Sequence, residues 1–289
     1  MKNSLKIEQM EKYKDCLGLG IAGNFALHLA QAGELEEFKE IITAEEAAPK
    51  GMFPFYLPNN PNTSANPLLK TFPLSSTTIK LPKEDVNIQA EPEVGLLCNI
   101  TYEGDNVKSI TPTHFGAYND SSIRVAGASK ISDKKNWGKE SKGFSNTLFA
   151  IDKFADTGIM DSFSICSFLK RDGRLEAYGE NVALNGYSYF YKKLTEWMIN
   201  QINTQKDFGP LEPLKNYIKE CNYPSKAIIS IGATRYTSYG EHTFLQKEDE
   251  IFIVVYNSKK LTLDLVTLAL ENSNYDDTAM SVLAQKVLL

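Results

Sequence analysis

The sequence predicts a mainly β fold of the α+β class, organised as a single domain. Strand signals dominate, because segments 75–82, 86–104, 227–240 and 250–257 combine period-two alternation with β-branched residues. Helical periodicity is sparse, and no regular succession of strands and helices indicates a doubly wound parallel sheet. At 289 residues, the chain is long enough to bury a substantial core without stabilising cross-links.

Turn sequences mark where the predicted strands reverse direction. The EGDN sequence at 103–106 predicts a hairpin that returns through 107–110. An Asp-Gly pair at 172–173 predicts a second hairpin, and an Asn-Gly pair at 185–186 predicts a further turn. These turns support the mainly β interpretation.

Helices are expected in three segments. Residues 16–38 begin with small and apolar residues and then become helical until Gly33 weakens the pattern. Residues 187–203 have an amphipathic pattern, and 261–289 are expected to be helical with a break around 271–277. By contrast, segment 58–67 contains three prolines and four asparagines, which predicts an exposed loop.

Composition favours small-molecule chemistry. The net charge of -5 and pI of about 5.4, without a long basic cluster, argue against a nucleic-acid-binding surface. The charged N-terminus lacks an apolar core, and no segment approaches the ~20 apolar residues of a membrane span, so we expect a cytoplasmic protein that binds no membrane. The four cysteines are far apart and form no CxxC pair, which predicts reduced thiols.

Two acidic residues in the second predicted strand lie two positions apart. Because successive strand side chains point to opposite faces, Glu91 and Glu93 project to the same face. If that face is buried, the two carboxylates repel each other unless a cation lies between them. Asp120 could add a third oxygen ligand, which would satisfy half of the roughly six-oxygen shell of Mg²⁺. The alternative is that both glutamates are solvated charges on an exposed strand face.

Six sequence blocks together resemble the fumarylacetoacetate hydrolase superfamily. They occur in the same order and at similar intervals as in that family: GLGIAGNFALH, QAEPEVGLL, GAYNDSSIR, NWGKESKGF, ALNGYSYF and AIISIGATRY. The resemblance implies a mixed β-sandwich roll of that family's C-terminal-domain type, with a few peripheral helices, over residues 17–257. Residues 1–16 would then be an N-terminal extension, 58–67 a loop insertion and 258–289 a helical C-terminal extension. A homodimer is also implied.

By position, the resemblance implies that Glu91, Glu93 and Asp120 bind Mg²⁺ or Mn²⁺. An oxo acid or 1,3-dicarbonyl acid could then chelate the ion through two oxygens. The ion would stabilise the enolate that forms when a C–C bond breaks or a proton leaves. The implied reactions are C–C bond hydrolysis, decarboxylation and tautomerisation of a small-molecule substrate.

Three further residues take roles from matching positions. Arg124 would bind the substrate carboxylate, and Lys139 in the KESKGF block would place positive charge beside the enolate. His28 would activate water or carry the substrate's proton. From the residues alone, His28 could equally be a packed histidine, and Arg124 a structural partner of Asp120. The polar run that holds Lys139 and Lys142 could equally be solvated surface.

The chain departs from the family pattern beside the histidine. The family has HxxE, whose Glu couples to the His and orients water, whereas this chain has Gln31 at that place. Glu34 could substitute only if the helix bends or ends at Gly33, because six residues from His28 is the opposite face of a regular helix. Gln31 could instead hold a water molecule.

Two positions at which the family contacts its substrate also differ in this chain. The Gln that follows the Arg in the family is Gly127 here, and the family's TGTP turn has become the sequence IGAT at 231–234, with Ala233 in place of a polar residue. Thr234 could partly compensate by contacting substrate. These changes affect the transfer of hydrolase activity more than the transfer of metal binding. A second interpretation is therefore a non-catalytic metal- or ligand-binding member of the same fold.

A dinucleotide-binding loop is the third interpretation. Gly18, Gly20 and Gly23 form a GxGxxG sequence, and Glu36 or Glu37 follows somewhat under twenty residues later. However, only a short charged strand precedes the glycines, and no series of βαβ units follows. We therefore expect no binding of NAD or NADP.

Overall fold

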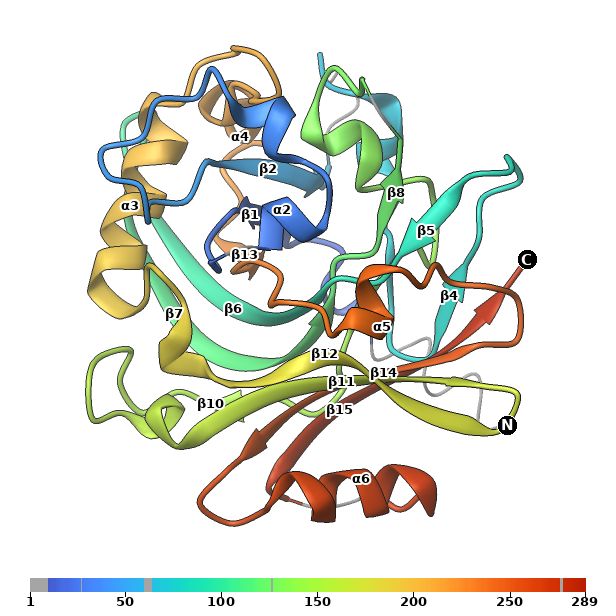
Figure 1. The fold of residues 1–289 in the computed structure, drawn as a ribbon. Helices are drawn as coiled ribbons and strands as arrows, with labels where there is room; N and C mark the ends of the chain where they lie inside the picture. The colour runs from blue at the N-terminus through green and yellow to red at the C-terminus, as the bar shows by residue number, and fades with distance from the viewer. Residues whose placement is uncertain (1–9, 27, 60–63, 126, 276–277) are drawn as a thin grey trace.

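A computed structural model describes residues 10–26, 28–59, 64–125, 127–275 and 278–289 of the chain. These residues form an eight-stranded, a five-stranded and a two-stranded sheet, with few helices (Figure 1). The predicted mainly β fold is therefore confirmed. Residues 1–9 of the expected N-terminal extension lie outside the described residues.

The larger sheet curls around the centre of the molecule (Figure 1). Its strands are β1 Leu17–Ala22, β2 Gly51–Tyr56, β3 Leu74–Ser75, β6 Pro92–Glu103, β7 Asn106–Asn119, β9 Lys142–Phe144, β10 Phe149–Ala150 and β13 Lys226–Ser230. They lie in the order β2-β1-β13-β6-β7-β9-β3, and β10 also pairs with β7. The long β6–β7 hairpin pairs from Pro92 opposite Asn119 to Glu103 opposite Asn106, with register shifts after Leu97 and after Thr101.

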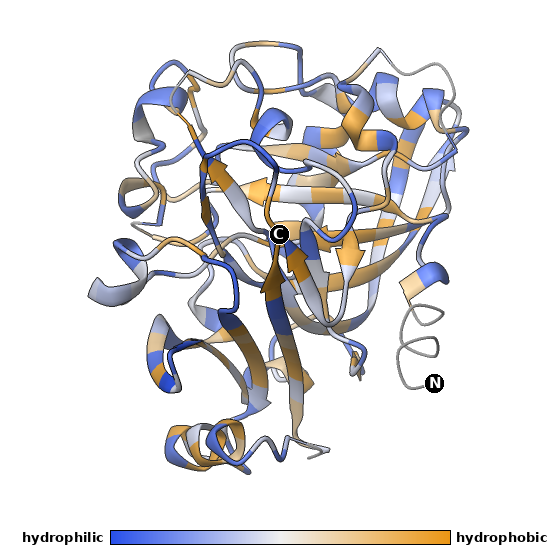
Figure 2. Cartoon of the chain, turned by 90° about the vertical axis from the view of Figure 1, so that its right-hand side faces the viewer, coloured by the Kyte–Doolittle hydropathy of each residue, from blue (hydrophilic) through white to orange (hydrophobic). Residues whose placement is uncertain are grey.

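The five-stranded sheet packs against this hairpin. Its strands are β4 Thr78–Lys80, β11 Phe163–Arg171, β12 Arg174–Ala183, β14 Glu250–Asn257 and β15 Met280–Leu288, in the order β12-β11-β14-β15-β4. Strands β5 Asn87–Gln89 and β8 Ser122–Arg124 form the third sheet. The main core joins Val94 and Leu96 of β6 to Ile165 of β11 and Val255 of β14. Figure 2 shows hydrophobic residues concentrated on the strands.

Helices are short and peripheral. They are α2 His28–Gln31, α3 Tyr191–Thr204, α4 Leu214–Glu220, α5 Ser238–Glu241 and α6 Leu263–Glu271, with 3₁₀ helices η1 Leu35–Phe38, η2 Pro67–Lys70, η3 Ile131–Lys134, η4 Ile159–Ser162 and η5 Leu184–Gly186. Helices α3 and α4 lie against the eight-stranded sheet, and α6 lies along the outer side of the five-stranded sheet (Figure 1). Within the described ranges, no helix has the length and apolar character needed to cross a membrane.

The predicted turns and the predicted amphipathic helix over 187–203 are confirmed with small shifts. Asp172 and Gly173 both have positive φ, 51° and 78°, as a tight two-residue hairpin between β11 and β12 requires. The Asn-Gly pair at 185–186 lies in η5, and the helix predicted over 187–203 is α3. The described parts of the 58–67 loop contain no strand, while residues 60–63 of that prediction lie outside the described residues.

The predicted helix over 261–289 is correct only for α6. Residues Met280–Leu288 are strand β15, which pairs antiparallel with β14 and parallel with β4. Every second residue from Ser281 to Val287 is buried, so the segment has strand periodicity. Its Leu, Ala, Gln and Lys residues favour helices, and the pairing with two neighbouring strands overrides that preference.

The GxGxxG sequence has a packing role in this fold. Gly18 and Gly20 lie inside strand β1 rather than in a turn that opens a helix. A Cβ atom on Gly18 would overlap the Phe55 ring, and one on Gly20 would overlap the Phe53 ring. The glycines therefore let two aromatic rings of β2 pack onto β1, and the strand-to-helix turn that dinucleotide binding requires is not formed there.

Gly240 allows α5 to approach strand β12. A Cβ atom at this position would overlap the Tyr178 carbonyl oxygen, which is backbone and cannot move aside alone. We predict that Gly240→Ala lowers the free energy of unfolding by about 2–3 kcal/mol. Gly186→Ala is the matched control, because the nearest atoms to its Cβ would be at 3.6 Å. Urea denaturation of both variants tests this prediction, and equal stabilities would contradict it.

Candidate functional site

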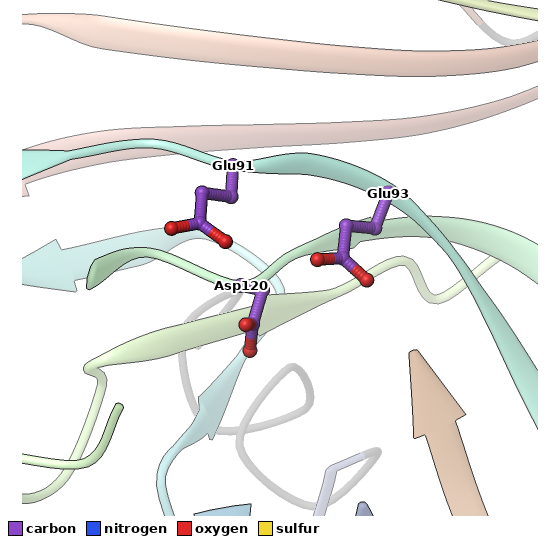
Figure 3. Close-up of side chains that lie close together, drawn as sticks. All are labelled: Glu91, Glu93 and Asp120. Atoms are coloured by element: carbon purple, nitrogen blue, oxygen red, sulfur yellow. The ribbon is translucent and has the colours of Figure 1, made fainter. Parts of the chain in front are cut away.

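The three predicted metal ligands converge at the end of the β6–β7 hairpin. Glu91 immediately precedes β6, Glu93 is its second residue, and Asp120 immediately follows β7. One oxygen from each carboxylate lies within 4.8 Å of the other two. Figure 3 shows both glutamate side chains on the same side of the chain, with Asp120 below them. All three are at most 3% exposed, so the shared buried face is confirmed and the solvated-face alternative is wrong.

Buried cations neutralise two of these carboxylates. Lys135 Nζ lies 2.7 Å from Glu91 Oε2 and 2.6 Å from Asp120 Oδ2. Lys142 Nζ lies 2.7 Å from Asp120 Oδ1, and Arg124 Nη2 lies 3.0 Å from Glu91 Oε1. Burial alone would raise the pKa of Glu91, but the charges of Lys135 and Arg124 outweigh it and lower the pKa. Glu91 is therefore ionised.

Glu93 has no basic partner at ion-pair distance among the described residues. Its Oε2 accepts one hydrogen bond, from the Gly232 backbone N–H at 2.9 Å. Burial, followed by the charges of Asp120 and Glu91, raises the pKa of Glu93 well above its usual range. Gly232 can present its N–H because the chain leaves β13 after Ser230 and turns with a φ of 111° at Gly232. The observed strand β13 therefore ends at Ser230, and is shorter than the strand predicted over 227–240.

The donor set of this centre fits a divalent cation. Carboxylate oxygens are the ligands that Mg²⁺ and Mn²⁺ prefer. Within the described part of the chain, both Asp120 oxygens and Glu91 Oε1 accept no well-oriented hydrogen bond, although each takes part in an ion pair. The cavity beside the carboxylates has a volume of about 10 Å³, close to the minimum for one water molecule. The centre therefore offers ligands to an ion, but Lys135 already lies between two of them.

His28 forms part of the wall of this cavity. Its Nδ1 lies 3.0 Å from the Thr234 carbonyl oxygen. With the proton on Nδ1, that nitrogen donates to the carbonyl and Nε2 is the proton acceptor. Burial lowers the pKa of His28, which favours the neutral imidazole. The Thr234 N–H and hydroxyl both donate to the Pro92 carbonyl, at 3.0 and 3.3 Å, so Thr234 positions His28.

Glu34 reaches the cavity because the helix ends as the sequence required. Gly33 has a φ of 71°, and the Glu34 N–H donates to the Leu29 carbonyl at 2.9 Å, in the pattern of a Schellman C-cap. The Glu34 carboxylate pairs through Oε1 with Arg124 at 2.9 Å and with Lys134 at 2.8 Å. Burial raises the pKa of Glu34, but these cations outweigh it and the net shift is downward.

Arg124 is enclosed by acceptors. Its partners are Gln89 Oε1 at 2.7 Å, Glu34 Oε1 at 2.9 Å, Glu91 Oε1 at 3.0 Å and the Tyr236 hydroxyl at 3.0 Å. The alternative that Arg124 pairs with Asp120 is therefore wrong. Because three of the five guanidinium N–H groups donate hydrogen bonds and Glu91 Oε1 lies at ion-pair distance, Arg124 has little free capacity for a substrate carboxylate.

Gln31 and Lys139 do not join the carboxylate centre. The Gln31 amide accepts from the Tyr236 N–H at 2.9 Å and donates to the Tyr236 carbonyl at 3.1 Å, which links α2 to the segment before α5. Lys139 is exposed, whereas Lys142 in the same KESKGF block is fully buried. Strand β9 pairs with the end of β7, which places Lys142 beside Asp120 and leaves Lys139 in the preceding loop. The centre therefore uses the second lysine of the block.

Two other substitutions noted in the sequence have different surroundings. Ala233 lines the cavity. Gly127 lies in an exposed turn after β8 with a φ of 77°. Lys135 was not identified from the sequence at all, because a lysine in the polar run ISDKKNW carries no signal that distinguishes burial from solvation.

The pairing of Lys142 with Asp120 gives a direct test of which lysine belongs to the centre. Lys142→Met should lower the free energy of unfolding by about 3 kcal/mol, because it removes one partner of a fully buried carboxylate. Lys139→Met should change stability by less than about 0.5 kcal/mol. Guanidinium chloride denaturation measures both, and a larger loss in the Lys139 variant would contradict this assignment.

Another buried carboxyl, that of Glu212, supports the 3₁₀ helix η3, which immediately precedes Lys135. The Ser132 hydroxyl of η3 donates to Glu212 Oε1 at 2.8 Å, and Glu212 Oε2 accepts no hydrogen bond from the described residues. Burial raises the pKa of Glu212 from 4.5 to about 7. Between these two values the folded state keeps a proton that the unfolded state releases. Stability should therefore fall as the pH rises from about 4.5 to 7, and should not change further above that range.

We predict that Glu212→Gln removes this pH dependence. The shift corresponds to about 3 kcal/mol at 1.36 kcal/mol per unit. Urea denaturation at pH 5 and at pH 7.5, an interval that covers most of the shift, should show wild type losing roughly 2–2.5 kcal/mol more stability than Glu212→Gln. The exposed-site control Glu196→Gln should retain the wild-type dependence. Parallel pH profiles for wild type and Glu212→Gln would rule out the proposed cause.

Solved structures with a similar fold support the architecture. A protein assigned to the fumarylacetoacetate hydrolase family, from Yersinia pestis CO92, has a TM-score of 0.52 and 13% identity, over 94% of this chain and 93% of that one. Cg1458 with an inhibitor has a TM-score of 0.54 and 13% identity, over 94% and 76%. An uncharacterised protein from Mycobacterium abscessus has a TM-score of 0.50 and 12% identity, over 94% and 78%. The fold is therefore that of fumarylacetoacetate hydrolase family proteins, as the sequence blocks predicted.

Sequence comparison gives a family without an assigned activity. No curated protein matches the chain. One family model matches residues 34–287, which is most of the sequence and includes all three acidic residues. The chain therefore belongs to DUF5718, a family of unknown function.

Proposed function

We propose that this protein is a metal-dependent enzyme that acts on a small oxo acid or 1,3-dicarbonyl acid. One observation carries the proposal: three buried carboxylates and the buried imidazole of His28 border the same cavity. Glu91, Glu93 and Asp120 would hold Mg²⁺ or Mn²⁺. The reaction would be C–C bond hydrolysis, decarboxylation or tautomerisation.

The residues around the cavity suit proton transfer next to a carbonyl group. A divalent ion would polarise two oxygens of an oxo acid and favour the loss of a proton or a carbon fragment beside the carbonyl. His28 Nε2 would accept and return the proton, because Nδ1 is engaged by Thr234. Lys142, rather than Lys139, would add positive charge at the site through its position beside Asp120.

Glu34 would take the place of the glutamate that the family usually has three residues after the histidine. It lines the cavity together with His28, and both of its ion pairs use Oε1. Its Oε2 would then orient a water molecule. Arg124 would act mainly by holding Glu34 and Glu91, and a substrate carboxylate would reach it only by replacing one of them.

A non-catalytic member of the same fold that binds a metal or an organic acid is the second candidate. Gln31 favours this reading, because its amide is committed to the Tyr236 backbone and cannot orient water as a catalytic glutamate would. The small cavity also favours it, since a substrate requires the lining side chains to move.

Metal binding should be visible as stabilisation. Mn²⁺ at about 100 times its dissociation constant should raise the melting temperature of the wild type by roughly 5–10 °C, because an ion that binds only the folded state adds about 2.7 kcal/mol. Glu93→Gln removes the charge of one ligand with little change in shape and should abolish the shift. Glu196→Gln, on an exposed helix surface, should retain it. Equal responses of wild type and Glu93→Gln would rule out this site.

Turnover distinguishes the two candidate functions. The Mn²⁺-loaded wild type would be assayed against acylpyruvates, oxaloacetate and related oxo acids. An enzyme should convert at least one of them, and Lys142→Met should lose that activity while Lys139→Met keeps it. Binding of oxo acids without conversion across the panel would favour the non-catalytic candidate.

A further inference from the structure

Lys135 occupies an unusual place among the charges of the centre. Its Nζ contacts Glu91 Oε2 at 2.7 Å and Asp120 Oδ2 at 2.6 Å. Among the described residues, it is the one basic side chain in ion-pair contact with two of the three candidate ligands. Of these three ligands, Lys142 is in ion-pair contact with Asp120 alone and Arg124 with Glu91 alone.

Hydrogen bonds of the residues before and after Lys135 fix its position in the fold. Before it, the Ser132 hydroxyl is bonded to Glu212, and the Lys135 N–H donates to the Ser132 carbonyl at 3.1 Å. After it, the Asn136 amide donates to the Phe55 carbonyl at 2.8 Å and to the Thr71 carbonyl at 3.0 Å. Lys134 is bound to other acids, Glu34 and Glu37. The backbone of Lys135 is therefore fixed, and a withdrawal from the centre would have to be a movement of its side chain.

The side chain is also packed where it lies. Lys135 is 3% exposed, and its Nζ is 5.1 Å from the centre of the Phe53 ring. A cation at this position is stabilised by two carboxylates and by the face of an aromatic ring. Phe53 in turn lies over Gly20 of β1, so the strand itself supports the arrangement.

A metal ion and the Lys135 ammonium group cannot share this position. A Mg²⁺ ion bound between Glu91 and Asp120 would need their oxygens at about 2.0–2.1 Å, and Lys135 Nζ already contacts one oxygen of each. Two cations this close would also repel each other strongly in a buried site. The cavity of about 10 Å³ has no space to hold the displaced ammonium beside a hydrated ion.

We infer that Lys135 is a built-in cation that occupies the metal position, so that a divalent ion binds only when this side chain withdraws. The inference rests on the proposed metal site and adds a regulatory property to it. In the metal-free protein Lys135 bridges Glu91 and Asp120. The affinity of the centre for a divalent ion is therefore lower than the three carboxylates alone would give. Glu93, which lacks a cationic partner at ion-pair distance among the described residues, is the ligand whose ionised form the metal would stabilise.

The test measures Mn²⁺ affinity of the metal-free, full-length protein by titration calorimetry and by the electron paramagnetic resonance signal of free Mn²⁺. Lys135→Met keeps the length and apolar stem of the side chain and removes its charge. It should bind Mn²⁺ at least about tenfold more tightly than the wild type, a difference of about 1.4 kcal/mol. Lys139→Met, an exposed lysine of a nearby loop, should bind as the wild type does.

The Lys142→Met variant tests whether Lys135 matters because it occupies the metal position or only because it adds positive charge near the carboxylates. It removes one positive charge beside Asp120 but leaves Lys135 in place, so it should gain clearly less affinity than Lys135→Met. An equal gain in both variants would overturn the inference. Adding Glu93→Gln to Lys135→Met should abolish the gain, and a gain that survives would also overturn it.

The outcomes distinguish this inference from the proposed function. If the wild type binds Mn²⁺ and Lys135→Met binds it no more tightly, the inference is overturned but the proposed metal site stands. Binding by Lys135→Met but not by wild type would support the inference and contradict metal use by the native protein. Absence of binding in both folded proteins would overturn both. If Lys135→Met does not fold without metal, Lys135→Gln, whose amide can still donate to the carboxylates, gives the same comparison.

Discussion

The compensation of buried carboxylate charge is the constraint on which this structure depends. Glu91, Glu93 and Asp120 are removed from water at the end of one hairpin, and an isolated carboxylate in such a place is strongly disfavoured. Lys135, Lys142 and Arg124 are brought to them from three segments, the residue after η3, strand β9 and strand β8. Each of these segments is thereby tied to the hairpin by an ion pair as well as by packing.

The surrounding backbone serves the same centre. The turn at Gly232 delivers an N–H to Glu93, and Thr234 immediately beyond it fixes the tautomer of His28 through its carbonyl. The C-cap at Gly33 redirects Glu34 from the far side of the helix to the cavity wall. Functional groups from α2, the β6–β7 hairpin and the segment after β13 therefore meet although they are far apart in sequence.

Two kinds of cation suit the same carboxylates. An organic ammonium supplies one charge and directional hydrogen bonds, whereas a divalent ion supplies two charges and can also bind a substrate oxygen. The metal-free arrangement uses the first, through Lys135. The three acidic residues offer ligands for the second, and the balance between the two would decide whether the centre holds a divalent ion.

The sequence by itself determined the mainly β class, both tight hairpins, the helix α3 and the three acidic residues, because these depend on local periodicity, turn chemistry and ordered blocks. It also indicated that Glu34 could reach the site only if the helix bends or ends at Gly33. Tertiary structure alone decided that Lys142 and Lys135, rather than Lys139, face the carboxylates, since burial of a lysine leaves no local pattern. It likewise decided that Met280–Leu288 is a strand, because pairing with β14 and β4 outweighs the helix preference of its residues.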